Sequence, residues 1–283
     1  MDSPFRMAAP ILVIGMHRSG TRLLADILAR LGVFMGADRQ GDSESITFIR
    51  INEAIFHQCA TFWTEPMPVH VLLAQPEQLE RMAALVRDTL PAELAHYAGG
   101  SSWRLPDSAQ QAALPFGWKD PRNTFTLPVW KRIFPSLRAI HVVRHGVDVA
   151  ASLARRHHRF CVAASGGAVP SALAVFEDHS LGVLSSRRGW TLGEAFAMWE
   201  QYVEKARLES AALGERALEV RFEELLGAPH DAIPAIARFC GVDAAAADAG
   251  WLERVEPARA FAFRREPELA AFARAAPEIL ERY

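Results

Sequence analysis

The sequence predicts an α/β fold: a single domain over residues 1–283 in which helices flank a central parallel β-sheet. Short apolar runs alternate along the chain with longer segments of helical periodicity, which is the pattern of strands joined by crossover helices. The chain is also long enough to bury a large core, with 50% hydrophobic and 23% charged residues. No internal repeat suggests another architecture.

The first strand, loop and helix are the clearest elements. The run PILVI at 10–14 is typical of a buried parallel strand, and a glycine-containing turn follows it. Residues 22–31 then repeat leucine and isoleucine on one helical face, with Gly32 placed to end the helix.

Later elements continue the alternation. Asn123 is expected to cap the helix that it begins. The remaining strands are predicted at 116–119, 137–143 and 217–222. Further helices are predicted at 45–59, 76–97, 123–134, 147–159, 191–213 and 229–240. The polar residues 98–115 form a connection, and residues 160–188, with paired glycines and a proline, are interpreted as a lid on the substrate side.

Composition excludes several classes of protein. The chain has 31 Lys and Arg against 33 Asp and Glu, a net charge of −2, so a nucleic-acid partner is not expected. Its three cysteines are odd in number and far apart, which fits neither a disulfide framework nor a metal knuckle, and we expect reduced thiols in a cytoplasmic protein. The run 11–14 is too short for a signal peptide, and no integral membrane segment is predicted.

The loop GMHRSGT at 15–21 is a candidate anion site. Backbone N–H groups in such a turn, together with the positive end of the following helix dipole, favour a phosphate or sulfate. A nucleoside-triphosphate loop reads G-x-x-x-x-G-K-S/T, but Thr21 and Arg22 stand at its last two positions. The missing lysine argues against hydrolysis of ATP or GTP, while Arg18 supplies a cation elsewhere in the loop.

A second anion site is predicted where the strand 137–143 ends. Arg144 follows the strand, and Ser152 lies eight positions later on the second turn of the next helix. A guanidinium fork and a hydroxyl at this spacing can converge on one phosphate monoester. A nucleotide hydrolase would favour an Asp here for magnesium.

The segment ILVIGMHRSGTRLLADIL at 11–28 resembles the phosphosulfate-binding loop of sulfotransferases that use 3′-phosphoadenosine 5′-phosphosulfate (PAPS), especially bacterial members related to carbohydrate sulfotransferases. The resemblance implies a P-loop nucleotide-binding type of fold, with PAPS as donor and 3′,5′-bisphosphate (PAP) as product. It places Arg18 on the sulfuryl group. The other predicted cofactor-binding residues of this loop are His17, Ser19, Gly20, Thr21 and Arg22. Arg22 either adds charge to the phosphate or turns outward.

Residues 140–152 resemble the 3′-phosphate motif of the same family. The resemblance implies that Arg144 and Ser152 bind the 3′-phosphate and that Asp148 is mainly a cap and dipole partner of the helix. The segment RFEEL at 221–225 resembles a later family segment of mainly structural role, although its carboxylates could imitate a magnesium-binding strand end. No metal site is predicted.

Acid–base residues are suggested by two further resemblances. Residues 41–53 resemble a bacterial pattern in which Glu44 accepts the proton of the acceptor; the alternative is an ordinary helix-start carboxylate, with Asp42 and the histidines as reserves for the base. The stretch KDPR at 119–122 resembles one in which Lys119 faces the reacting sulfate. Asp120 would hold Lys119 or Arg122, and Arg122 could contact an anionic or sugar substrate.

The predicted function is sulfuryl transfer from PAPS to a hydroxyl, or an amine, of a sugar, lipid or small-molecule acceptor. The alternatives are a P-loop small-molecule kinase and a non-catalytic protein that binds the 3′,5′-bisphosphate. The basic run 155–159 is interpreted as a solvated helix end, or as a feature that attracts an anionic acceptor.

Overall fold

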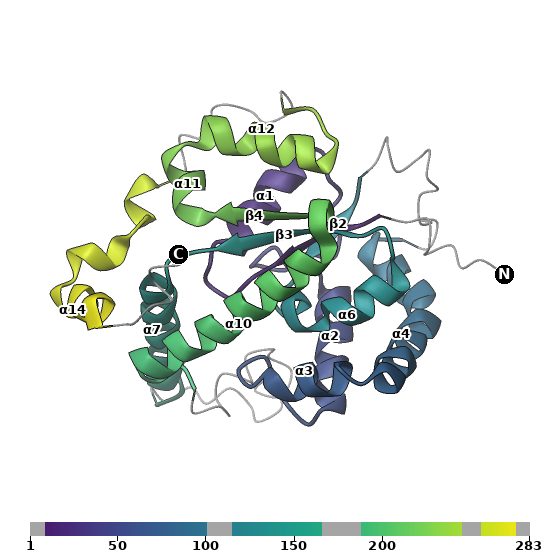
Figure 1. The fold of residues 1–283 in the computed structure, drawn as a ribbon, viewed down its shortest axis with the longest axis horizontal. Coiled ribbons are helices and arrows are strands. Elements are labelled where there is room, and N and C mark those ends of the chain that lie inside the picture. Colours follow the sequence, from purple (N-terminus) through teal and green to yellow (C-terminus); the bar gives the residue numbers. More distant parts are fainter. Residues whose placement is uncertain (1–8, 101–114, 166–187, 245–255, 276–283) are drawn as a thin grey trace.

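A parallel sheet lies at the centre of the protein (Figure 1). The computed structural model describes residues 9–100, 115–165, 188–244 and 256–275. Within these ranges the sheet has four strands in the order β2-β1-β3-β4, and each neighbouring pair is parallel. The strands are β1 (Ile11–Ile14), β2 (Gly117–Lys119), β3 (Arg138–Val143) and β4 (Ala217–Arg221). The predicted α/β class with a central parallel sheet is therefore confirmed.

Alternation along β1 divides the core into two layers. Ile11 and Val13 pack into the layer beneath α1 (Thr21–Arg30), α11 (Phe222–Gly227) and α12 (Pro229–Cys240), while Leu12 and Ile14 face the larger opposite layer. Figure 1 shows these two groups of helices on opposite faces of the sheet. The larger layer is covered by α2 (Ile46–Gln58), α3 (Met67–Leu73), α4 (Pro76–Tyr97), α6 (Asn123–Ile133), α7 (Gly146–Ser165) and α10 (Leu192–Leu213).

Most predicted elements match the observed ones to within a few residues. Helices 76–97 and 229–240 have the bounds predicted from sequence, and α7 continues past 159 to Ser165. The predicted lid and the connection before β2 largely lie outside the described residues. No helix of the described part of the chain is long and apolar enough to cross a membrane.

Several short elements were not predicted. The helix α3 has only seven residues, too few for a helical period to emerge, and α11 follows β4 without a break. After residue 256 the chain forms the short 3₁₀ helices η4 (Pro257–Arg259) and η5 (Ala262–Arg265) and then α14 (Pro267–Ala275). Another 3₁₀ helix, η2 (Gly214–Arg216), precedes β4.

The predicted cap of α6 is wrong. The helix does begin at Asn123, but its N-cap position is Arg122 and no side chain caps it. The Asn123 side chain instead accepts hydrogen bonds from Asn52 Nδ2 at 2.8 Å and Trp118 Nε1 at 3.2 Å. Because both donors are buried, pairing them is worth more than satisfying one more N–H at the helix end.

Candidate functional site

The loop between β1 and α1 has the backbone of an anion cradle. Arg18 and Gly20 both adopt the left-handed conformation, with φ of 71° and 97°. A Cβ on Gly20 would lie 2.2 Å from the Phe222 ring, so this position requires glycine. Thr124 Oγ1 accepts a hydrogen bond from Gly15 N at 2.9 Å and ties the start of the loop to α6. The loop is thus held in a strained conformation at the N-terminus of α1.

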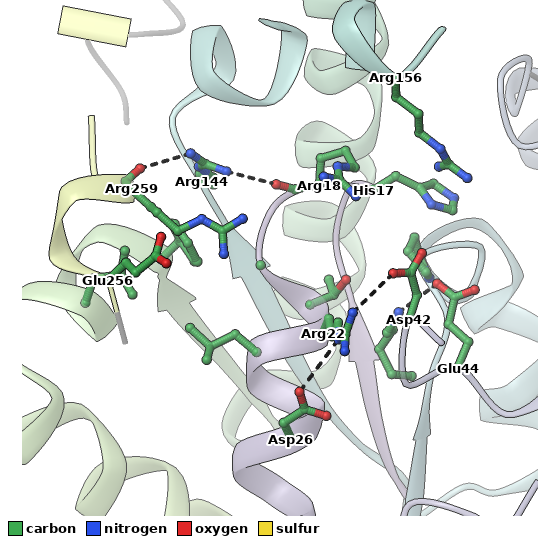
Figure 2. Close-up of a pocket in the computed structure, with 17 residues that line it drawn as sticks. His17, Arg18, Arg22, Asp26, Asp42, Glu44, Arg144, Arg156, Glu256 and Arg259 are labelled. Atoms are coloured by element: carbon green, nitrogen blue, oxygen red, sulfur yellow. Dashed lines mark hydrogen bonds and ion pairs between the residues drawn. The ribbon is translucent and has the colours of Figure 1, made fainter. Parts of the chain in front are cut away.

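A cavity of about 330 Å³ opens in front of this loop (Figure 2). It lies at the carboxyl ends of the strands, where ligands of open parallel sheets bind. Of the predicted site residues, the cavity is lined by His17, Arg18, Gly20, Thr21, Arg22, Glu44, Lys119 and Arg144. Ser19 is buried within the loop, and Ser152 lines an adjoining cavity that it shares with Arg144.

Hydrogen bonds join the two predicted anion sites. Arg18 Nε donates to Ser152 Oγ at 3.0 Å, and Arg144 Nη1 donates to the carbonyl of Arg18 at 3.4 Å. Arg144 Nη2 donates to the carbonyl of Arg259 at 3.0 Å, and the guanidinium lies over the Phe222 ring. The tertiary structure therefore brings the loop and the residues that follow β3 into direct contact.

Buried polar atoms at this site fit a bound anion. Ser19 Oγ and Arg144 Nε are buried and have no hydrogen-bond partner within the described residues. Burial lowers the pKa of both Arg18 and Arg144, although Asp148, which lies 3.4 Å from Arg144, opposes this effect on Arg144. A phosphate or sulfate offers the acceptor oxygens and the negative charge that such groups need.

Lys119 and Glu44 form a buried ion pair in the wall of the cavity. Lys119 Nζ lies 2.7 Å from Glu44 Oε1, and the lysine side chain is 2% exposed. Burial raises the pKa of Glu44, against the opposing effect of Lys119. Glu44 directly precedes Ser45, the N-cap of α2, and Lys119 ends β2. One group can accept a proton, and the other can stabilise negative charge at the same wall.

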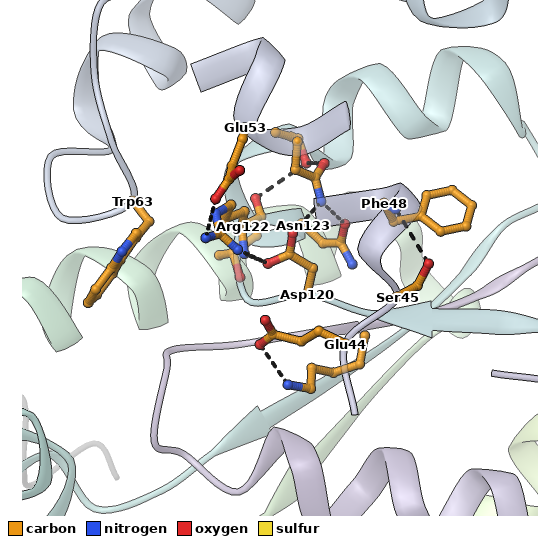
Figure 3. A network of polar contacts seen from close by, with 12 residues as sticks. Glu44, Ser45, Phe48, Glu53, Trp63, Asp120, Arg122 and Asn123 are labelled. Carbon is orange, nitrogen blue, oxygen red and sulfur yellow. Dashed lines mark hydrogen bonds and ion pairs between the residues drawn. The ribbon is translucent and has the colours of Figure 1, made fainter. Parts of the chain in front are cut away.

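Arg122, three residues after Lys119, belongs to a different network of polar contacts (Figure 3). Its guanidinium contacts Asp120 at 3.0 Å and Glu53 at 2.9 Å. Burial alone would lower the pKa of Arg122, but these two carboxylates raise it above its usual value. Asp120 also accepts from Asn52 Nδ2 at 2.8 Å. Asp120 thus holds Arg122 rather than Lys119, and Arg122 does not line the cavity.

His17, within the loop, is held uncharged. Burial, followed by the charges of Arg122 and Arg156, lowers its pKa well below the usual value. Its ring lies 4.2 Å from that of Trp63. The side chain therefore offers the cavity a neutral ring rather than a cation.

Arg22 lines the cavity and lies between two carboxylates. Its side chain is 61% exposed, and its guanidinium lies 3.8 Å from Asp26 and 3.9 Å from Asp42. Because Arg22 is largely exposed but also lines the cavity, both alternatives considered for Arg22 stay predictions.

Asp148 lies in the first turn of α7, as expected of a dipole partner, and it also pairs with Arg144 at 3.4 Å. Its carboxylate accepts hydrogen bonds from Ala262 N at 3.0 Å and Phe263 N at 2.7 Å. The C-terminal segment thereby reaches the site and brings Glu256 and Arg259 to the cavity. Sequence analysis missed this contribution, because these residues carry no local motif.

One of the carboxylates that follow β4, Glu223, makes a contact that stabilises the structure. Glu223 Oε1 accepts a hydrogen bond from His145 N at 3.0 Å, which holds the turn that follows β3. In the described part of the chain, no group of three or more His, Cys, Asp or Glu side chains is placed to hold a metal ion.

A family model identifies the family of this chain, and one solved structure shows a similar fold. A model described as "Sulfotransferase family" matches residues 10–246, and no curated protein matches. Among solved structures, the sulfotransferase domain from the curacin biosynthetic pathway is 16% identical with a TM-score of 0.52, over 95% of this chain and 98% of that domain. The sulfotransferase domain from the Synechococcus PCC 7002 olefin synthase is 18% identical with a TM-score of 0.47, over 92% and 89%.

Proposed function

This chain belongs to the sulfotransferase family, and we propose that it moves a sulfuryl group from PAPS to a hydroxyl or amine of a sugar, lipid or small-molecule acceptor. One observation carries the proposal. A single cavity joins the anion loop, the Lys119–Glu44 pair and Arg144, which are the groups that donor binding and transfer both require.

Donor binding is assigned to two ends of the site. The N–H groups of the loop, with Thr21 and the N-terminus of α1, bind the 5′-phosphosulfate. Arg144 and Ser152 bind the 3′-phosphate, which supplies acceptors for Arg144 Nε and the Ser152 hydroxyl. Bound PAPS supplies an activated sulfuryl group whose bond to the phosphate oxygen breaks as a bond to the acceptor forms.

The protein contributes a base and two cations to this reaction. Glu44 accepts the proton of the acceptor, and its raised pKa suits that role because the carboxyl then holds a proton more readily. Lys119 stabilises the negative charge that develops as the sulfuryl group leaves the phosphate. Arg18, at the centre of the loop, provides a second positive charge beside the sulfonate.

Calorimetric titration with adenosine 3′,5′-bisphosphate tests the assignment of the donor. We expect tight binding to the wild-type protein and none to Arg144→Ala. ATP with magnesium is titrated in parallel, and a preference for it would establish the kinase alternative instead. Bisphosphate binding without turnover on any acceptor would identify a non-catalytic binding protein.

A further inference from the structure

Glu44 lies in a short turn that is closed by a bridge between Arg39 and Ser45. Gln40 N donates to the carbonyl of Glu44 at 2.9 Å, and Ser43 N donates to the carbonyl of Gln40 at 2.8 Å. Ser43, directly before Glu44, has a φ of 58°, a left-handed conformation that is strained for a residue with a Cβ. Such a conformation persists only where neighbouring contacts hold it, so these contacts determine where Glu44 points.

The chain after Glu44 is fixed by the start of α2. Ser45 is the N-cap of α2, and its Oγ donates to Asp38 Oδ2 at 3.0 Å. Thr47 N donates to the same oxygen of Asp38 at 2.8 Å. These contacts anchor the residue that follows Glu44, but none of them involves the residue that precedes it.

The residue before Glu44 is held by a side chain of α1. Ser43 Oγ donates to Asp26 Oδ1 at 2.6 Å. The other oxygen of Asp26 lies 3.8 Å from Arg22 Nε, and Arg22 Nη1 lies 3.9 Å from Asp42 Oδ1 (Figure 2). The hydrogen bond is short and has a charged acceptor, whereas the two ion pairs are long and largely exposed. We therefore assign the anchoring of residue 43 chiefly to the Asp26 carboxylate.

Asp26 connects this turn to the helix that is assigned to the donor. The helix α1 begins at Thr21, directly after the anion loop, and Asp26 lies five positions later, which is about 7.5 Å along the axis. Both Asp26 and Glu44 line the cavity. Because one helix carries the donor site at its N-terminus and the partner of Ser43 one turn further on, it sets the distance between the two.

We propose that Asp26 is a positioning residue, which through its hydrogen bond to Ser43 holds the Glu44 carboxylate where it accepts the proton of the acceptor. The inference rests on the proposed sulfuryl transfer with Glu44 as base. Asp26 takes no proton itself and acts on Glu44 through the backbone of the turn. Alignment matters because misplacement of a reacting group by about 1 Å can lower a rate by about 10²-fold.

Two substitutions of Asp26 separate the hydrogen bond from the ion pair. Asp26→Ala removes both contacts and should lower kcat by about 10- to 100-fold, while calorimetry finds bisphosphate binding unchanged. Asp26→Asn loses the charge but keeps an oxygen that accepts from Ser43, so kcat should stay close to the wild-type value. Ser43→Ala should reproduce the loss seen in Asp26→Ala.

The matched control is Glu194→Ala, which should leave kcat unchanged. Glu194 also accepts a hydrogen bond from a hydroxyl, that of Thr191 at 3.0 Å, but it does not line the cavity. An equal loss of kcat in Asp26→Asn and Asp26→Ala would assign the effect to the charge and overturn the proposal. A raised KM for the acceptor with unchanged kcat would also overturn it, because Asp26 would then bind the acceptor directly.

A double-mutant cycle tests whether Asp26 acts through Glu44. In a Glu44→Gln background, Asp26→Ala should cause no further fall of kcat, because the proton acceptor is already absent. The same fold-change in both backgrounds would overturn the proposal.

Amide hydrogen exchange makes the test independent of turnover. In the protein without ligands, the amides of Gln40 and Ser43 should exchange about tenfold faster or more in Asp26→Ala, as expected for loss of one charge-assisted hydrogen bond. Asp26→Asn should keep the wild-type exchange. Equal exchange in Asp26→Ala and the wild type would overturn the proposal. A wild-type protein that transfers no sulfuryl group from PAPS would instead contradict the proposed function, whatever the exchange rates.

Discussion

Lys119 and Arg122 lie three residues apart on one segment but have opposite environments. Lys119 has one carboxylate partner, Glu44, and lines the cavity. Arg122 has two, Asp120 and Glu53, and is withdrawn from the cavity. Both side chains are almost fully buried. The motif KDPR thus combines a group that is available to a ligand with one whose contacts are already made.

This difference gives Lys119 and Arg122 separate roles. A buried cation is tolerated only when its charge and its hydrogen-bonding groups are satisfied. The Arg122 network meets that condition and fixes the start of α6 against α2. The Lys119–Glu44 pair has one hydrogen bond between its members, so a ligand that replaces this contact can satisfy either group.

Removal of the Asp120 carboxylate should have the largest effect on the free energy of unfolding. We expect Asp120→Ala to lower the free energy of unfolding by about 3–5 kcal/mol, because it breaks a buried pair and leaves Arg122 undercompensated. Urea unfolding measures the loss. Glu80→Ala removes the partner of exposed Arg132 and should cost at most about 1 kcal/mol. Equal losses in the two variants would contradict the distinction.

The substitution Glu44→Gln tests the role of the Lys119–Glu44 pair. Transfer should fall by about 10²- to 10⁴-fold, the range for loss of a general base, while calorimetry finds bisphosphate binding unchanged. The amide keeps the shape of the side chain but cannot accept the proton. Full activity would show that a residue other than Glu44 is the base, and Asp42→Asn would then be the next variant to measure.

Lys119→Met should reduce transfer by about 10²-fold, through loss of one electrostatic contact to developing charge. Stability should fall less than in Asp120→Ala, because Glu44, whose pKa is already raised, can take up a proton. Lys205→Met is the matched control. Lys205 also forms a buried pair, with Glu209 at 2.6 Å, but does not line the cavity. Steady-state rates per folded molecule that fall equally in both variants would remove Lys119 from the mechanism.

We expect the smallest effect for the pH dependence of stability, at the contact between His145 and the C-terminal segment. The His145 ring stacks on Phe263 at 4.2 Å, and burial lowers the pKa of His145 to about 4. Between pH 6.5 and about 4 the unfolded chain binds a proton that the folded protein excludes. Stability is therefore fully present above this range and lost as pH falls through it. His145→Phe should keep the stacking and show a shallower loss on acid titration of unfolding, whereas a slope unchanged from the wild type would contradict this origin.

The sequence by itself determined the α/β class and the edge of the sheet where the main motifs meet. Apolar runs and helical spacing are local signals, so the strands and long helices could be predicted from neighbouring residues alone. Parallel strands place their carboxyl ends at one edge, and this rule predicts that the loop at 15–21, Lys119 and Arg144 meet there. The observed cavity contains all three.

Only the tertiary structure decided which side chains pair. Asp120 takes Arg122 rather than Lys119, Asn123 joins a buried network rather than a cap, and Asp148 holds the C-terminal segment. Each choice depends on a partner that is distant in sequence or on a competing buried donor, and no local periodicity encodes either. The free energy of satisfying buried polar groups, summed over the folded chain, selects these partners.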